Sequence, residues 1–272
     1  MDSLIKRYPF LAFFLLAYGI TWLAVIPFAL GAFPIPMFPF GPLVAAIIVA
    51  AVCGGWQGTK SLLLRMVQWR AAPRWYAFAL LLPAAVTFGA AYINVVAFGA
   101  SDPTISILAA LPSLVPAFAV MMLNPFQGSL GEELGWRGFA LPRLLSNRSP
   151  LVASLLLGVL VAGWHAPLFV TGLYADAWLR ILFIVSTTVL WTMLFRGTGG
   201  SVLLAMVFHT GWNLSPEIVF SSFSGAELHQ SIVLYTVGGI AVSIFATMLA
   251  WRRLTGARLS AAVAPAHAPA AA

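Results

Sequence analysis

The chain has 272 residues, of which 61% are hydrophobic and 8% are charged, and its formal net charge is +7. This composition, with a mean hydropathy of +0.98, indicates that most of the chain lies in lipid. The single cysteine, Cys53, excludes an internal disulfide and a cysteine-rich metal site.

Apolar segments long enough to cross a bilayer recur along the whole chain. A hydrocarbon core about 30 Å thick needs roughly 20 apolar residues per helical crossing. Segments of about ten residues with alternating polarity, the mark of a spanning β-barrel, are not seen. We therefore predict an all-α, polytopic membrane protein with about eight transmembrane helices around a catalytic cavity. The eight segments are about Pro9–Leu30, Phe38–Gly54, Trp75–Phe98, Ile105–Leu123, Leu151–Gly172, Ala177–Phe195, Ser201–Phe223 and Ser231–Trp251.

The basic residues predict the orientation of these segments. Eight crossings place 13 of the 14 lysines and arginines on the side of Lys6 and Arg7, and only Arg180 on the other side. By the positive-inside rule both termini are cytoplasmic, and we expect the plasma membrane of a prokaryote. The positive charge then reflects topology and contact with anionic membrane lipids, not binding of nucleic acid. Residues 1–255 are expected to form one membrane domain, followed by a disordered cytoplasmic tail at 256–272.

Two adjacent acids stand out between the fourth and fifth segments. Glu132 and Glu133 are followed by Arg137 in the run Gly128-Ser129-Leu130-Gly131-Glu132-Glu133-Leu134-Gly135-Trp136-Arg137. A carboxylate near the bilayer centre costs about 2.5–3.5 kcal/mol, so ionisable groups there mark functional sites by default. Glu133 and Arg137 are four residues apart and can pair on one helix face, which leaves Glu132 available for another role.

Two later segments each carry polar residues at depth. His165 lies in the fifth segment, where Pro167 is expected to break the helix. His209 and Asn213 lie four residues apart in the seventh, so both project into one cavity. A carboxylate and an imidazole can activate a water molecule, while a second imidazole and a carboxamide can stabilise an oxyanion. Each residue alone has a structural explanation as a helix-pairing group. Together they favour hydrolysis of an amide bond.

The three motifs resemble those of the CPBP intramembrane proteases, which include CAAX-processing endopeptidases and bacteriocin-processing and immunity proteins. Glu132 to Arg137 matches the family's EExxxR motif, His209 to Asn213 its HxxxN motif, and His165 the histidine of its FxxxH motif, with Val161 in place of the usual Phe. The stretch 197–201 is similar to the family's lead-in to the third motif. The resemblance covers about residues 120–215.

This resemblance implies a glutamate-type endopeptidase with a cavity open to the cytoplasm. Glu132 and His165 would activate water, His209 and Asn213 would stabilise the oxyanion, and Glu133 and Arg137 would support the site. The substrate would be a peptide or protein at the membrane, lipidated or not. No cofactor is expected. Because some descriptions of the family call its members metalloproteases, Zn²⁺ held by Glu132, His165 and His209 stays an alternative, although HExxH is absent.

Two other functions use the same residues. A proton-coupled transporter would carry protons or cations on these acids and histidines, although no inverted repeat is evident. A catalytically silent, immunity-type membrane protein would keep the motifs for structure alone.

Overall fold

The computed structural model describes residues 2–173 and 176–255, and the regular structure within these ranges is helical throughout. The predicted tail at 256–272 lies outside them. Six helical stretches are long and apolar enough to cross a membrane, and α10 (Pro150–Trp164) is a shorter apolar helix. The prediction of a polytopic helical fold is confirmed, and the chain is an integral membrane protein. The six stretches are Pro9–Ala29, Gly41–Val67, Pro73–Phe98, Thr104–Leu123, Ala177–Gly197 and Gly225–Leu249.

Each predicted segment contains at least one helix. The longer ones are α2 (Pro9–Trp22), α4 (Gly41–Leu64), α5 (Pro73–Phe98), α12 (Ala177–Gly197), α13 (Val202–Val219) and α14 (Gly225–Leu249). The shorter ones are α1 (Asp2–Arg7), α3 (Val25–Ala29), α6 (Thr104–Ala110), α7 (Leu114–Leu123), α8 (Ser129–Glu133), α9 (Leu141–Leu145), α11 (Ala166–Val170) and α15 (Trp251–Thr255). The fifth and seventh predicted segments form α10 and α13, which are not among the six long apolar stretches.

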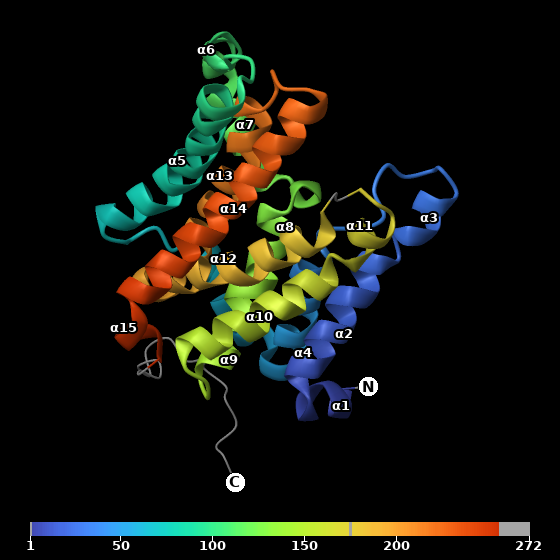
Figure 1. The fold of residues 1–272 in the computed structure, drawn as a ribbon. Helices are drawn as coiled ribbons and strands as arrows, with labels where there is room; N and C mark the ends of the chain where they lie inside the picture. Colours follow the sequence, from blue (N-terminus) through green and yellow to red (C-terminus); the bar gives the residue numbers. More distant parts are fainter. Residues whose placement is uncertain (1, 174–175, 256–272) are drawn as a thin grey trace.

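The acidic pair follows a break in the helical path. α7 ends at Leu123, and the Asn124 side chain accepts a hydrogen bond of 2.9 Å from the backbone N–H of Phe126 in the next turn. Gly128 then takes a φ of +94°, which favours glycine, and α8 begins. Figure 1 shows α7, α8 and α9 following one another toward the end of the bundle that holds the N-terminus. The chain thus continues through the bundle and carries Glu132 and Glu133 into its interior.

Close packing against α4 keeps this segment in place. The residues between α8 and α9, Leu134–Ala140 (η4), form a π-helical stretch that is buried throughout. A Cβ on Gly135 would lie 2.5 Å from the Cβ of Pro42, so only glycine permits this approach of the two backbones. Trp136 and Phe139 of the same stretch pack with Phe13 of α2 in a shared apolar cluster.

A second break lies at His165, as Pro167 predicts. α10 ends at Trp164, and α11 begins at Ala166. Two hydrogen bonds between Trp164 and residues of α2 stabilise this break. The indole N–H of Trp164 donates to Thr21 Oγ1 at 2.8 Å, and the indole N–H of Trp22 donates to the Trp164 carbonyl at 3.0 Å. His165 is therefore held at a defined place although it lies between two helices.

Candidate active site

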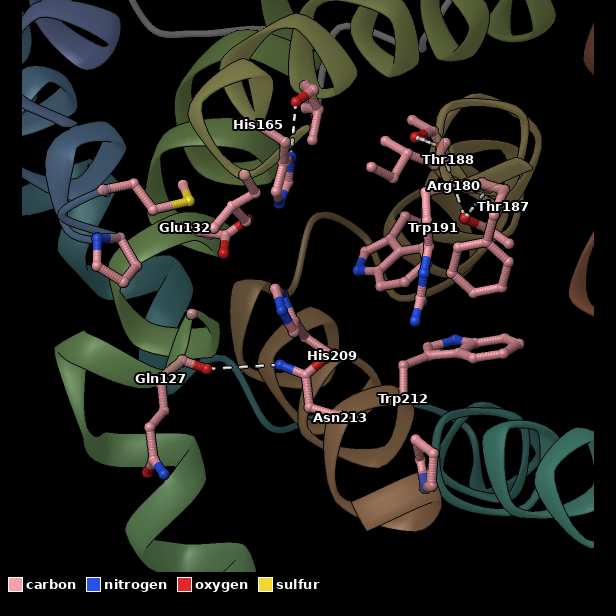
Figure 2. Close-up of a pocket in the computed structure, with 18 of the residues that line it drawn as sticks. Gln127, Glu132, His165, Arg180, Thr187, Thr188, Trp191, His209, Trp212 and Asn213 are labelled. Carbon is pink, nitrogen blue, oxygen red and sulfur yellow. Dashed lines mark hydrogen bonds between the residues drawn. The ribbon is translucent and has the colours of Figure 1, made fainter. Parts of the chain in front are cut away.

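The two breaks face one cavity. A pocket of about 540 Å³ is lined by Glu132, His165, His209 and Asn213 together with residues of α12 and α14. The structure thus brings together the four predicted catalytic residues, which are separated by up to 81 positions along the chain (213 minus 132). Figure 2 shows Glu132 and His165 reaching into this space from one side, and His209 and Asn213 from α13 on the other.

Glu133 contacts both Arg137 and His209 next to the pocket. Its side chain is fully buried, and its Oε1 accepts hydrogen bonds from Arg137 Nη1 at 2.9 Å and from His209 Nδ1 at 2.7 Å. The predicted pair with Arg137 is present. The contact with His209 joins residues 76 positions apart and is invisible to helical spacing. Arg137 is fixed further by the Trp191 ring, whose centroid lies 4.7 Å from its guanidinium carbon.

His165 is oriented by its own helix. Its Nδ1 lies 2.8 Å from the carbonyl oxygen of Val161, so Nδ1 carries the hydrogen and Nε2 is the acceptor nitrogen. Val161 occupies the position where the family usually has Phe, yet its backbone makes this contact. The substitution therefore leaves the orientation of His165 intact.

The turn before α8 forms the wall opposite His165. The Asn213 amide nitrogen lies 3.5 Å from the Gln127 carbonyl oxygen, which orients the carboxamide (Figure 2). A Cβ on Gly128 would lie 2.9 Å from Glu132 Oε1 and 3.1 Å from His209 Nε2. Glu132 and His209 thus face the same small volume, and the absence of a side chain at Gly128 keeps it open.

The alternative metal site is not assembled in this geometry. Among the described residues, no three His, Cys, Asp or Glu side chains lie close enough together to hold a metal ion. Glu132, His165 and His209 all line the pocket, but they do not form such a group.

A family model described as "Type II CAAX prenyl endopeptidase Rce1-like" matches residues 110–215. These residues form an Rce1-like domain. CAAX prenyl protease 2 of Methanococcus maripaludis is 35% identical over 98 residues, which cover 32% of this chain and 36% of that relative. The Rce1-like domain contains all four predicted catalytic residues and the Glu133–Arg137 pair. The family resemblance carried by the three motifs is confirmed.

One charged residue of the pocket was assigned no role in the site from the sequence. Arg180, the single basic residue predicted on the outer side, lines the pocket of the Rce1-like domain from the first turn of α12. The sequence does show that Arg180 is the one basic residue on the predicted outer side. The positive-inside rule uses this fact only to assign topology, so it did not point to the pocket. His229 Nε2 and Asp176 Oδ2 lie 3.6 Å apart in a partly exposed contact, and neither residue lines the pocket.

The pocket lies toward the end of the bundle opposite α1 and α15. It is lined by Ile35 in the α3–α4 loop, Leu168 in α11 and Phe220 after α13, whereas α1, α9 and α15 lie at the other end (Figure 1). Cytoplasmic termini and a pocket open to the cytoplasm, both expected from the sequence, stay predictions; the first would place this end of the bundle outside the cell, and the second would favour the opposite orientation.

Cysteine labelling decides between these two orientations. In a Cys53→Ser background, Lys60→Cys lies near the end of α4, Asp102→Cys lies just before α6, and Leu173→Cys lies at the pocket; Leu173 is 49% exposed and lines the pocket. Because the positive-inside rule favours cytoplasmic termini, we expect membrane-impermeant maleimide to label the Asp102→Cys and Leu173→Cys variants in intact cells. The Lys60→Cys variant should be labelled only after lysis. The reverse pattern would place the pocket in the cytoplasm.

The buried ion pair makes a separate prediction for folding. Removing one partner of such a pair costs about 3–5 kcal/mol, so Arg137→Ala is expected to lower folded yield and activity. The double variant Glu133→Gln with Arg137→Gln should give more folded protein than either single variant. It should not recover activity, because the amide lacks the charge with which the Glu133 carboxylate accepts from His209 Nδ1. The measurements are yield after size-exclusion chromatography and peptide turnover, and strictly additive losses in yield would contradict the coupling.

Proposed function

We propose that the chain is an intramembrane endopeptidase that hydrolyses a peptide bond of a membrane-associated peptide or protein with an activated water molecule. The observation that carries this proposal is the placement of Glu132 and His165 on one side of the pocket and of His209 and Asn213 on the other. In our proposal the first two are acceptors and the last two are donors. A water molecule needs the first pair, and the carbonyl that it attacks needs the second. The name of the Rce1-like family supports a peptidase.

The charge of His209 follows from its neighbours. Its Nδ1 hydrogen is directed to Glu133, so Nε2 donates to an oxyanion only when the ring is doubly protonated. With His209 charged, the cluster of Glu132, Glu133, Arg137 and His209 is neutral as a whole. A neutral cluster is favoured away from water, and we infer that Glu133 keeps His209 in the charged, donating form.

The reaction then balances without a covalent intermediate. Glu132 takes a proton from the water that it holds with His165, and the hydroxide oxygen bonds to the scissile carbonyl carbon. His209 and Asn213 stabilise the resulting oxyanion. As the C–N bond breaks, Glu132 returns the proton to the leaving nitrogen, which gives a new carboxyl end and a new amine.

Cleavage by the purified protein tests this proposal. The protein in proteoliposomes is incubated with a peptide library in two forms, one with S-prenylated cysteines and one without. We expect defined cleavage products by mass spectrometry, absent with Glu132→Gln. A proton-coupled transporter or a silent membrane protein would give no products with either library. A preference for the prenylated form would extend to this chain the substrate class that the family name states.

Chelation tests the metal-free form of the mechanism. We expect EDTA or phenanthroline to leave turnover largely unchanged, because Glu132 and His165 suffice to activate water. The readout is the initial rate of peptide cleavage before and after chelation and dialysis. Activity that vanishes with chelator and returns with Zn²⁺ would instead make Glu132, His165 and His209 ligands.

A further inference from the structure

Two arginines lie close together at the end of the bundle that holds α1 and α9, away from the pocket. Arg65 begins the 3₁₀ turn Arg65–Val67 (η1) after α4, and Arg143 lies in α9. The segments that carry them are packed together, since a Cβ on Gly138 would lie 3.1 Å from Leu62 Cδ1. Burial, and to a lesser extent the positive charge of Arg65, lowers the pKa of Arg143 to about 10. The two guanidinium groups are therefore near enough to repel each other.

Each of these guanidinium groups lies over a buried aromatic ring. The guanidinium carbon of Arg143 is 3.5 Å from the Phe139 ring centroid, and that of Arg65 is 5.8 Å from the Phe195 centroid. Both rings belong to the same buried apolar cluster. A guanidinium that stacks on a ring is held through its flat face and keeps the N–H groups at its edge available. The packing thus orients both side chains without using most of their donors.

The protein supplies no acidic partner for this arginine pair. Within the described side chains, the ion pairs of Glu133 and Asp176 involve neither Arg65 nor Arg143. Arg143 Nη1 donates one hydrogen bond, of 2.8 Å, to the Phe139 carbonyl oxygen, and Arg65 donates none to the part of the chain that the structure describes. Two partly buried cations side by side are unfavourable unless an anion offsets their charge. The pair therefore calls for an anionic ligand with several acceptor oxygens.

The surroundings of Arg65 favour a lipid headgroup over a soluble anion. Gly55, with a φ of +55°, breaks α4 and separates its apolar first part from the turns that lead to Arg65. Trp56 and Trp69 lie on either side of Arg65 in the sequence, and both are largely exposed. Exposed tryptophans are typical of the boundary between membrane and water. Arg65 is therefore at the depth of the phospholipid headgroups.

We propose that Arg65 and Arg143 bind the phosphate group of an anionic phospholipid. The planar guanidinium matches the geometry of phosphate oxygens, and basic pockets between transmembrane helices can bind anionic headgroups. A zwitterionic lipid brings an ammonium group of its own to the two cations, so a lipid with a net negative charge is favoured. The bound phosphate joins α4 to α9. This binding is independent of the proposed peptidase function.

Lipid competition on the purified full-length chain tests the assignment. The protein in neutral detergent is titrated with dioleoylphosphatidylglycerol and with dioleoylphosphatidylcholine, and bound lipid is counted by native mass spectrometry. We expect phosphatidylglycerol to bind about 25-fold more tightly, as two basic residues near a membrane surface would give. Arg65→Gln and Arg143→Gln should each reduce this preference about fivefold. Arg148→Gln, the same change at an exposed arginine outside the pair, should keep it.

A charge reversal supplies a second readout, in thermal unfolding. Arg65→Glu places a carboxylate beside Arg143, so the variant has its own counter-charge. In nanodiscs of phosphatidylcholine alone, we expect this variant to unfold at a higher temperature than the unaltered protein. Adding phosphatidylglycerol should raise the unfolding temperature of the unaltered protein and leave that of the variant unchanged. If a Gln variant does not fold, the Lys variant at the same position carries the lipid test and should lose less of the preference.

Four outcomes would overturn the assignment. The first is equal binding of the two lipids to the unaltered protein. The second is a loss of preference in Arg148→Gln as large as in Arg65→Gln, which would assign the effect to general surface charge. The third is a rise in unfolding temperature with inorganic phosphate, in phosphatidylcholine nanodiscs, as large as with phosphatidylglycerol, which would make the ligand a soluble anion. The last is a lower unfolding temperature of Arg65→Glu in phosphatidylcholine, which would contradict the missing counter-charge.

Discussion

Glu132→Gln is expected to reduce peptide turnover to background while expression and substrate binding stay at the level of the unaltered protein. The amide has the shape of the carboxylate but cannot take a proton from water, and a positioned general base contributes about 10²–10⁴-fold on its own. In the structure Glu132 is 7% exposed and faces the volume bounded by Gly128 and His209 Nε2, where no other carboxylate among the described residues lines the pocket. Single-turnover cleavage and peptide binding measure the two effects separately.

A matched control isolates this effect from a general loss of acidic charge. Glu227 at the start of α14 accepts hydrogen bonds from Ser101 and does not line the pocket, so Glu227→Gln should cleave normally. Normal cleavage by Glu132→Gln would remove this residue from the mechanism altogether.

Asn213→Ala is expected to lower turnover by about 10²–10³-fold, the usual loss for one oxyanion donor, with a smaller change in binding. The carboxamide lies in the pocket beside His209, one helical turn away, and its nitrogen is directed by the Gln127 carbonyl. Asn147→Ala, an exposed asparagine in the α9–α10 loop, is the control. A rise in KM with unchanged kcat would show that Asn213 binds the ground state and the transition state equally and is no oxyanion group.

The general fold is readable from the sequence because lipid imposes a simple rule. Each crossing needs a long apolar run, and all eight predicted segments contain helices. The breaks in the helices can be predicted only in part from the neighbouring residues in the sequence. Pro167 predicts the break at His165, but nothing in the sequence shows that Thr21 and Trp22 of α2 fasten it.

The sequence identifies the candidate site residues by their side-chain chemistry, but it does not show which of them are in contact. The spacing of Glu133 and Arg137 predicts their pair, because both lie on one helix. The bond from His209 to Glu133 depends on the packing of α13 against α8 and is tertiary information. Arg180 shows the same limit, because its charge is visible in the sequence but the cavity beside it is not.

The hydrogen bonds between α10 and α2 bear on which fragment of the chain could be expressed as an active protein. The Rce1-like match covers residues 110–215 and includes every proposed catalytic group, yet the partners that shape those groups lie outside it. Pro42 packs against Gly135, Thr21 and Trp22 make hydrogen bonds with Trp164 at the carboxyl end of α10, and Tyr235 lines the pocket. An expression fragment limited to the matched segment would expose these surfaces to lipid. The matched motifs and the residues that pack against them therefore lie in different parts of this molecule.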